Sequence, residues 1–168
     1  MPIATPVVDA INAQVGNELG AHLQYLSISS WFSSEGLRQL STFFANQAAE
    51  EHEHAMKFVG YINDTGAPLV IPQITAPKAT FSTAEEAVAL SLAWEEEVTR
   101  QIHQIVDISV DGHDHATQTF LQWFVTEQVE EVATMGELLQ VVRRAGEQNL
   151  LLVEDYIART HPGAHSAG

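Results

Sequence analysis

Residues 67–82 read APLVIPQITAPKATFS, a segment with three of the six prolines of this 168-residue chain. Proline interrupts an α-helix because it lacks the backbone N–H and clashes with the preceding turn. The tracts on either side, residues 7–67 and 78–161, contain no proline. Apolar residues recur in both tracts at intervals of three and four, which is the period of an amphipathic helix. The sequence therefore predicts helices on both sides of one long non-helical connection.

Five helices are predicted within these tracts. The apolar pattern lapses near four glycines, and glycine commonly follows the last residue of a helix; these are Gly36, Gly66, Gly112 and Gly146. The helices then lie at about residues 7–34, 39–66, 83–111, 114–145 and 148–159. The residues from Ser82 to Glu85 are predicted to open the third helix as a capping box, in which a hydroxyl accepts from a free backbone N–H and the glutamate reaches back.

Four of the predicted helices are long and similar in length, at about 27–32 residues or roughly 40–48 Å. Amphipathic helices of matched length pack as a bundle, so the fold class is all-α, a four-helix bundle with a short fifth helix. The connection at residues 67–82 can run the length of such a bundle, which makes the second and third helices parallel. In this prediction residues 1–160 form one domain and residues 161–168 a flexible tail.

The charge and the composition exclude several classes of protein. Seven Lys and Arg against 22 Asp and Glu give a net charge of −15, which opposes binding to nucleic acid or to an anionic membrane. The chain has no cysteine, which excludes disulfides, thiolate metal sites and a cysteine nucleophile. No apolar run approaches the roughly 20 residues that span a bilayer, and the first residues do not read as a signal peptide. We expect a cytoplasmic protein.

Each of the four long predicted helices carries one carboxylate in phase with its apolar stripe. These carboxylates are Glu18, Glu51, Glu95 and Glu131. In the second helix, Glu51 and His54 are three residues apart and therefore share a face. In the fourth helix, Gln128 shares the stripe of Glu131. The pattern predicts a group of acidic side chains, with one imidazole, inside the bundle.

Four buried carboxylates repel one another unless protons or cations neutralise them. The seven basic residues are scattered, and none lies within one turn of these four glutamates on the same face; Lys57 is expected to point away from His54. A metal is then the remaining source of positive charge. Oxygen-rich ligation with an imidazole suits iron or manganese, and bridging carboxylates suit a pair of ions. Taken singly, Glu51-x-x-His54 and the run at residues 95–97 are typical of solvated surface groups, and their conjunction favours the metal.

The residues of the four long predicted helices resemble those of bacterial non-haem ferritins, and the resemblance covers nearly the whole chain. The matching stretches run from Glu18 through Tyr25 to Trp31, over AAEEHEHA at residues 48–55, around Glu95, and over FLQWFVTEQ at residues 120–128. The family has a single Glu-x-x-His, and its fourth helix has Gln-x-x-Glu. This sequence shares both features. The resemblance implies a ferritin-like bundle with one long crossover.

The resemblance also implies a set of iron ligands. Glu18 and His54 would bind one iron, Glu51 would bridge, and Glu95 and Glu131 would bind the second iron beside Gln128. Glu50, Glu127 and Glu130 match a third iron site on the cavity side. Tyr25 matches a tyrosine that lies against the centre and supplies an electron or a hydrogen bond. No methionine suited to ligate haem is evident, so haem is not expected.

The implied function is iron storage with ferroxidase activity. Fe(II) would be oxidised to Fe(III) by O2 or H2O2 and kept as a ferric mineral inside a homo-oligomeric shell of 24 subunits, with the short fifth helix along the four-fold axis. Animal ferritins line an access channel with acidic residues where this chain has Gln118 and Leu121; Asp111 and Asp114 are alternatives. Two rival functions remain open: a di-iron peroxidase or oxygenase of the rubrerythrin type, and a structural bundle with solvated acids. The lack of cysteine and the single Glu-x-x-His argue against the first.

Overall fold

The computed structural model describes residues 3–162, which are helical apart from their connections and contain no strand. The helices are α1 (Thr5–Ser34), α2 (Arg38–Thr65), α3 (Ala84–Asp111), α4 (His115–Ala145) and α5 (Leu150–Thr160), with a short 3-10 turn η1 (Glu147–Asn149) before α5. Each observed helix boundary lies within two residues of the predicted one. The predicted flexible tail lies mostly outside the described residues, which end at residue 162.

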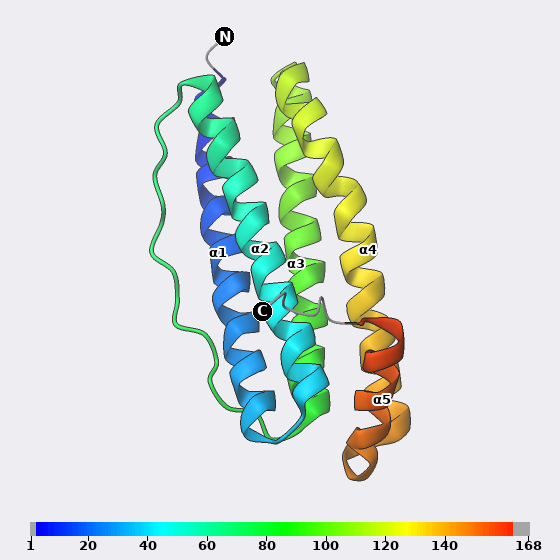
Figure 1. Cartoon of the computed structure of the whole chain (residues 1–168). Coiled ribbons are helices and arrows are strands. Elements are labelled where there is room, and N and C mark those ends of the chain that lie inside the picture. The colour runs from blue at the N-terminus through cyan, green and yellow to red at the C-terminus, as the bar shows by residue number, and fades with distance from the viewer. Residues whose placement is uncertain (1–2, 163–168) are drawn as a thin grey trace.

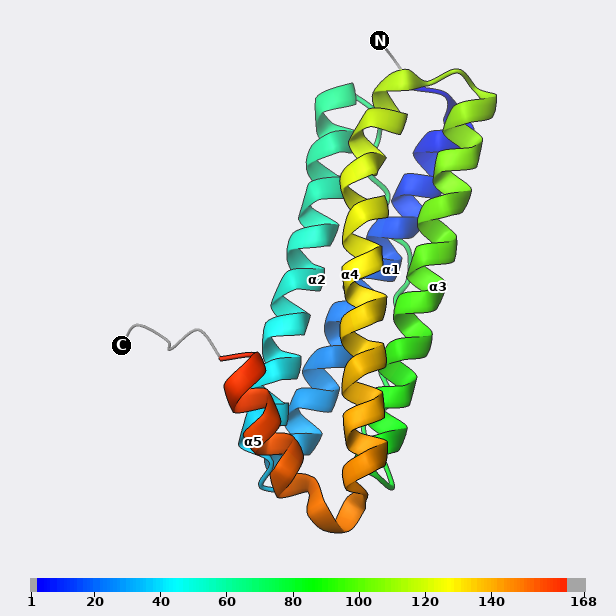
Figure 2. The same ribbon diagram turned by 90° about the vertical axis from the view of Figure 1, so that its right-hand side faces the viewer.

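The helices form a four-helix bundle, which confirms the predicted fold class. The helix α1 packs mainly against α2, and α3 packs mainly against α4 (Figure 1). The segment between α2 and α3 runs the length of the bundle beside α1, so α2 and α3 are parallel as predicted. The helix α5 turns back and lies against α2 and α4 at one end (Figure 2). Within residues 3–162, none of the helices is both long enough and apolar enough to cross a membrane.

Buried amides of α1 hold the crossover segment in place. Asn12 donates to the carbonyl of Pro68 at 3.0 Å and accepts from the backbone N–H of Val70 at 3.1 Å. Gln24 makes the same pair of bonds with the backbone of Lys78, at 3.0 and 2.9 Å. The segment has no neighbouring strand, so these side chains satisfy backbone groups that would otherwise be lost to burial. The crossover is therefore hydrogen-bonded to α1 near both of its ends.

The N-termini of α3 and α4 are capped by side chains. At α3, Thr83 accepts from the backbone N–H of Glu86 at 3.0 Å, and Glu86 accepts from the backbone N–H of Ser82 at 2.7 Å. The predicted capping box at residues 82–85 was therefore wrong by one residue, because the helix begins at Ala84 and the third helical residue is Glu86. At α4, Asp114 accepts from the backbone N–H of Thr117 at 2.9 Å.

The interior contains two separate apolar clusters. We call the cluster next to α5 the α5-end cluster; its members include Tyr25, Phe32, Phe44, Met135 and Leu138. We call the other the N-end cluster; its largest members are Ile11, Phe58, Ile102, Leu121 and Phe124. On each long helix, the two clusters are separated by a stretch that contains one of the four inward glutamates. A polar layer thus crosses the middle of the bundle.

Candidate metal centre

Six buried polar side chains form the layer between the two apolar clusters. They are Glu18, Glu51, His54, Glu95, Gln128 and Glu131, and each is at most 4% exposed. The apolar periodicity of the helices predicted that all six lie inside the bundle, and the structure confirms that they are buried. Each long helix contributes at least one of them, so the layer exists only when the whole bundle is assembled.

The side chains of Glu18, Glu51 and His54 come together at one side of this layer. One potential ligand atom from each lies within 4.8 Å of the other two. The Nδ1 atom of His54 is 3.3 Å from Glu51 Oε2 and 4.0 Å from Glu18 Oε2. Two carboxylate oxygens, Glu18 Oε2 and Glu51 Oε1, are buried without a hydrogen-bond partner. Buried acceptors of this kind are costly unless a cation or a proton meets them.

Gln14 orients the Glu18 carboxylate. Its amide donates to Glu18 Oε1 at 2.8 Å, and it in turn accepts from the amide of Asn17 at 3.2 Å. Gln14 is 1% exposed. The sequence pattern did not single out Gln14, although this residue lies four positions before Glu18 and therefore on the same helix face. The chain of amides leaves the second carboxylate oxygen of Glu18 free for a ligand.

The opposite side of the layer is held by hydrogen bonds. The hydroxyl of Tyr25 donates to Glu95 Oε1, and the amide of Gln128 donates to Glu95 Oε2 at 3.1 Å. Gln128 also donates to the hydroxyl of Thr99 at 3.2 Å, a contact that sequence analysis did not foresee. Both oxygens of Glu95 are therefore partnered, whereas Glu18 and Glu51 each keep one that is not.

Burial changes the proton affinity of the whole layer. Desolvation raises the pKa of Glu18 to about 7 and, together with the nearby Glu95 and Glu50, raises the pKa of Glu131 to about 9. The pKa of Glu51 is also raised well above its ordinary value, first by burial and then by Glu18. Burial lowers the pKa of His54 to about 4. Without a bound cation, the layer therefore holds protons on its carboxylates near neutral pH, while the imidazole is neutral.

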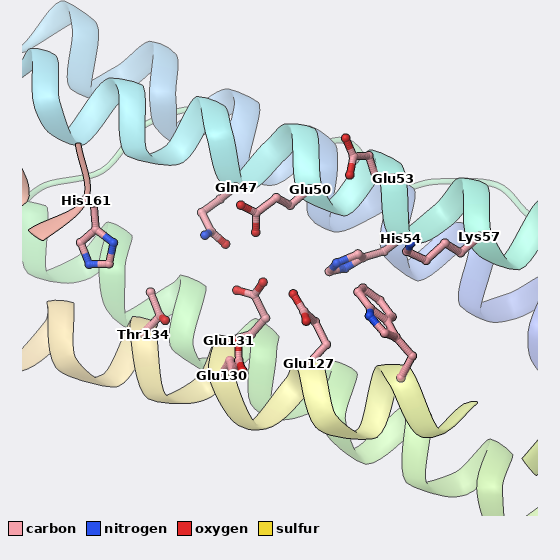
Figure 3. Close-up of a pocket in the computed structure, with 11 residues that line it drawn as sticks. Gln47, Glu50, Glu53, His54, Lys57, Glu127, Glu130, Glu131, Thr134 and His161 are labelled. Atoms are coloured by element: carbon pink, nitrogen blue, oxygen red, sulfur yellow. The ribbon is translucent and has the colours of Figure 1, made fainter. Parts of the chain in front are cut away.

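A second group of ligand atoms lies next to the layer. One atom each from His54, Glu127 and Glu131 falls within 4.8 Å of the others. These residues line a pocket of about 480 Å³ between α2 and α4, together with Glu50 and Glu130 (Figure 3). The structure thus places all three residues that matched a third iron site along this pocket. Burial raises the pKa of Glu50 and of Glu127, and the charges of Glu127 and Glu130, respectively, raise it further; at Glu50 a hydrogen bond with Glu131 offsets part of the rise in pKa.

Lys57 lies in the same pocket as His54, so the expectation that it points away from His54 was wrong. The two residues are three positions apart, which puts them on one face of α2. The Lys57 ammonium stands 4.5 Å from the centre of the Trp123 ring, and that ring contacts the His54 imidazole at 5.3 Å between centroids. The ammonium adds to the lowering of the His54 pKa.

The arginines and lysines do not neutralise the polar layer. Within residues 3–162, their ion pairs join exposed side chains: Lys78 with Glu86, Arg100 with Glu97, Arg143 with Glu85, and Arg159 with Asp155. The prediction that no basic residue meets the inward glutamates is confirmed for this part of the chain. The donor set that remains is carboxylate oxygen with one imidazole nitrogen, which suits iron or manganese.

Comparison with known proteins gives one consistent result. A family model described as a ferritin-like domain matches residues 8–145. The chain is 41% identical over 149 residues to ferritin BfrB of Mycolicibacterium smegmatis, covering 89% of this chain and 82% of that protein. It is 35% identical over 143 residues to a bacterial non-heme ferritin of Staphylococcus aureus, covering 85% and 86%. An open-pore ferritin from the archaeon Archaeoglobus fulgidus superposes with a TM-score of 0.89 at 32% identity, over 93% and 96% of the two chains.

Proposed function

The chain belongs to the ferritin-like family, and on this premise we propose that it oxidises Fe(II) to Fe(III) and stores the product as a ferric mineral. Curated relatives that bear the name ferritin, at 35–41% identity over most of the chain, support iron storage. The buried carboxylates and imidazole support the oxidation step. The cytosolic location expected from the composition stays a prediction.

The observation that carries the proposal is the pair of unpartnered oxygens on Glu18 and Glu51. Two buried carboxylates beside a neutral imidazole, with no lysine or arginine paired to them among residues 3–162, form a site for a cation. We assign Glu18 and His54 to one Fe(II) ion and Glu51 to a bridging position. Glu95 and Glu131 hold the other ion, with Gln128 beside it. Glu50, Glu127 and Glu130 take a third ion in the adjoining pocket.

The protein contributes charge, protons and orientation to the reaction. Fe(II) displaces the protons held by Glu18 and Glu51, because a carboxylate must be ionised to bind a metal. The anionic oxygens stabilise Fe(III) more than Fe(II), which lowers the free energy of oxidation. Each of two ferrous ions gives up one electron, and one molecule of O2 or H2O2 accepts both. Tyr25 holds Glu95 by its hydroxyl and lies close enough to supply a further electron.

Assembly into a shell of 24 copies belongs to the same proposal. The helix α5 turns Val153 and Ile157 into the bundle, while Leu151 and Leu152 are 77% and 64% exposed. Exposed leucines side by side on a helix indicate a partner surface. A complete shell would have 24 times the mass of the 18.4-kDa chain. Light scattering on a sizing column measures this mass directly, and a monomer or dimer would exclude the shell.

The oxidation step is tested by adding Fe(II) to the purified protein in air and following ferric absorbance. We expect Glu51→Gln, which keeps the shape of the side chain and removes its charge, to lower the initial rate at least about tenfold. The control is Glu96→Gln, since Glu96 is exposed on α3 one residue from Glu95. Equal rates for the parent protein and Glu51→Gln would contradict the assigned centre.

Storage is tested separately by iron retention. After oxidation, the protein is passed over a sizing column, and the iron that elutes with it is counted per chain. A storage protein retains far more iron than its three proposed sites can bind. Retention of three ions or fewer per chain, with normal oxidation, would favour the rubrerythrin-type alternative instead.

A further inference from the structure

The pocket beside the candidate centre continues past the residues assigned to iron. Figure 3 shows His54 and Lys57 at one end of the pocket, carboxylates in the middle, and His161 with Thr134 at the other end. Gln47 lies between the carboxylates and His161. The end next to α5 is therefore lined by neutral oxygen and nitrogen donors that the proposed ferroxidase does not use.

The order of residues along the helices fixes this arrangement. On α2, Gln47 lies one turn before Glu51 and one turn after Phe43. The ring of His161 packs edge-on against Phe43, with 5.3 Å between centroids. His161 is thus placed about one helical turn beyond Gln47 along the same groove. On α4, Thr134 follows Glu131 by three residues and completes that end of the pocket.

Gln47 has a buried acceptor without a partner. The side chain is 8% exposed, and its Oε1 atom is buried and accepts no hydrogen bond. The amide projects from α2 into the pocket, toward Glu50 and Glu131 (Figure 3). A residue needed only for packing at this position would be more stable as leucine or methionine, because an unmet buried acceptor is costly. The amide oxygen is therefore available to a ligand.

His161 is anchored although its side chain is exposed at the mouth of the pocket. Its backbone N–H donates to the carbonyl of Ile157 at 2.8 Å, which ends α5, and its ring rests on Phe43. The imidazole consequently stays beside the groove. Imidazole nitrogen with amide and carboxylate oxygen is a donor set for divalent transition-metal ions rather than for Mg²⁺ or Ca²⁺.

The two ends of the pocket differ in charge. Lys57 is the one lysine or arginine among the described residues that line it, and it lies at the His54 end. A cation in the pocket is repelled from that end and attracted by Glu50, Glu130 and Glu131 toward the middle. The end at Gln47 and His161 has no such repulsion.

We propose a further metal site at the α5 end of this pocket, at which Gln47 Oε1 and the imidazole of His161 bind a divalent transition-metal ion. Glu50 or Glu131 supplies the compensating negative charge, and water completes the coordination. Among residues 3–162, the two preformed groups of acidic and histidine ligands both contain His54, at the opposite end of the pocket, and neither includes His161, so this site is open and bound less tightly. A role of this site in binding iron transiently rests on the proposed function, whereas the existence of the metal site does not.

Zinc tests the site independently of oxidation, because Zn²⁺ has no redox chemistry and accepts the same donors. Crystals of the full chain soaked in Zn²⁺ should show an anomalous peak at His161, with Gln47 as its neighbour, in addition to peaks at the candidate centre. In solution, calorimetric titration should show that His161→Ala and Gln47→Leu each weaken Zn²⁺ binding at one site per chain by at least about tenfold.

Matched variants separate ligation from structure. Gln47→Glu keeps an oxygen donor, so this variant should bind Zn²⁺ at the proposed site as the parent protein does. Gln47→Leu loses the donor but should keep or raise the midpoint of thermal unfolding. His103→Gln removes an exposed histidine of α3 outside the pocket and should leave the titration unchanged. Identical titrations of His161→Ala and the parent protein, or soaked crystals with peaks only at the candidate centre, would overturn the proposal. A protein that does not oxidise Fe(II) but still places zinc at His161 would overturn the proposed function alone.

Discussion

The two apolar clusters and the polar layer between them are built from the same four helices but follow opposite physical rules. In the α5-end and N-end clusters, side chains such as Phe44 and Phe58 are fully buried against other apolar groups. In the layer, Glu18 and Glu51 are equally buried and leave acceptors unmet. The first arrangement stabilises the fold, and the second costs free energy. The bundle therefore carries its binding site as a destabilising layer, supported from both ends.

The largest expected effect is on stability and comes from the clusters. Phe44 is fully buried and contacts the rings of Phe32, Phe43 and Tyr25. Phe44→Ala leaves a cavity and should lower the free energy of unfolding by about 3–5 kcal/mol. Chemical denaturation of the metal-free protein measures this loss. A loss below about 1 kcal/mol would show that the α5-end cluster does not support the layer in the way described.

The next effect concerns the crossover, which runs beside α1 and packs Ala67 and Leu69 against the N-end cluster. A Cβ atom at Gly16 would stand 2.3 Å from Cγ of Pro72, so Gly16→Ala forces the segment away from α1. We expect a loss of about 1–3 kcal/mol, as for overpacked sites. Gly60→Ala is the control, because nothing lies within 4 Å of its Cβ position and alanine favours the helix. Equal effects of the two substitutions would mean that the crossover is not held tightly.

A smaller effect is the pH dependence of the polar layer. The pKa of Glu131 is raised to about 9 in the folded chain. The folded state then binds more protons than the unfolded state above the ordinary carboxyl pKa, and stability falls as the pH rises toward 9. Glu131→Gln should remove up to about 1.4 kcal/mol per pH unit from this slope. Denaturation of the metal-free protein between pH 5 and 8 measures it, and a slope unchanged by the substitution would contradict the raised pKa.

The smallest effect is at the N-terminus of α3, outside the polar layer. Thr83 caps α3 through its side chain, and Thr83→Ala should cost about 1 kcal/mol of stability. Fe(II) oxidation should proceed at the parental rate, since the cap lies outside the centre. Thermal unfolding and ferric absorbance measure the two quantities on one preparation. A reduced oxidation rate would show that the end of α3 is coupled to the layer.

The sequence predicted both regions because each depends on periodicity within a single helix. Proline-free tracts predicted the long helices, and the phase of Glu95 against its apolar stripe predicted a buried carboxylate. The contacts of Gln128 with Thr99 and of Gln14 with Glu18 were not predicted, although the second pair shares one helix face. Glutamine is most often solvated, so its position on a stripe does not by itself indicate a partner.

The features that the sequence did not predict depend on contacts between different helices. His161 reaches the pocket because α5 folds back on α2 and the histidine ring rests on Phe43, and no period within α5 predicts this contact. Lys57 was misplaced because its position depends on a residue of another helix: its ammonium lies over the ring of Trp123 in α4. Contacts between helices determine the positions of both side chains.

The most direct test of the destabilising layer is the midpoint of thermal unfolding with and without Fe(II), measured in the absence of oxygen. The parent protein should be stabilised by Fe(II), by about 2.7 kcal/mol for each site at a free ion concentration of 100 times Kd. The double variant Glu18→Gln, Glu51→Gln should unfold at a higher temperature than the metal-free parent and should not respond to Fe(II). A double variant that is less stable than the metal-free parent, yet is stabilised by Fe(II) as strongly as the parent, would contradict the central claim.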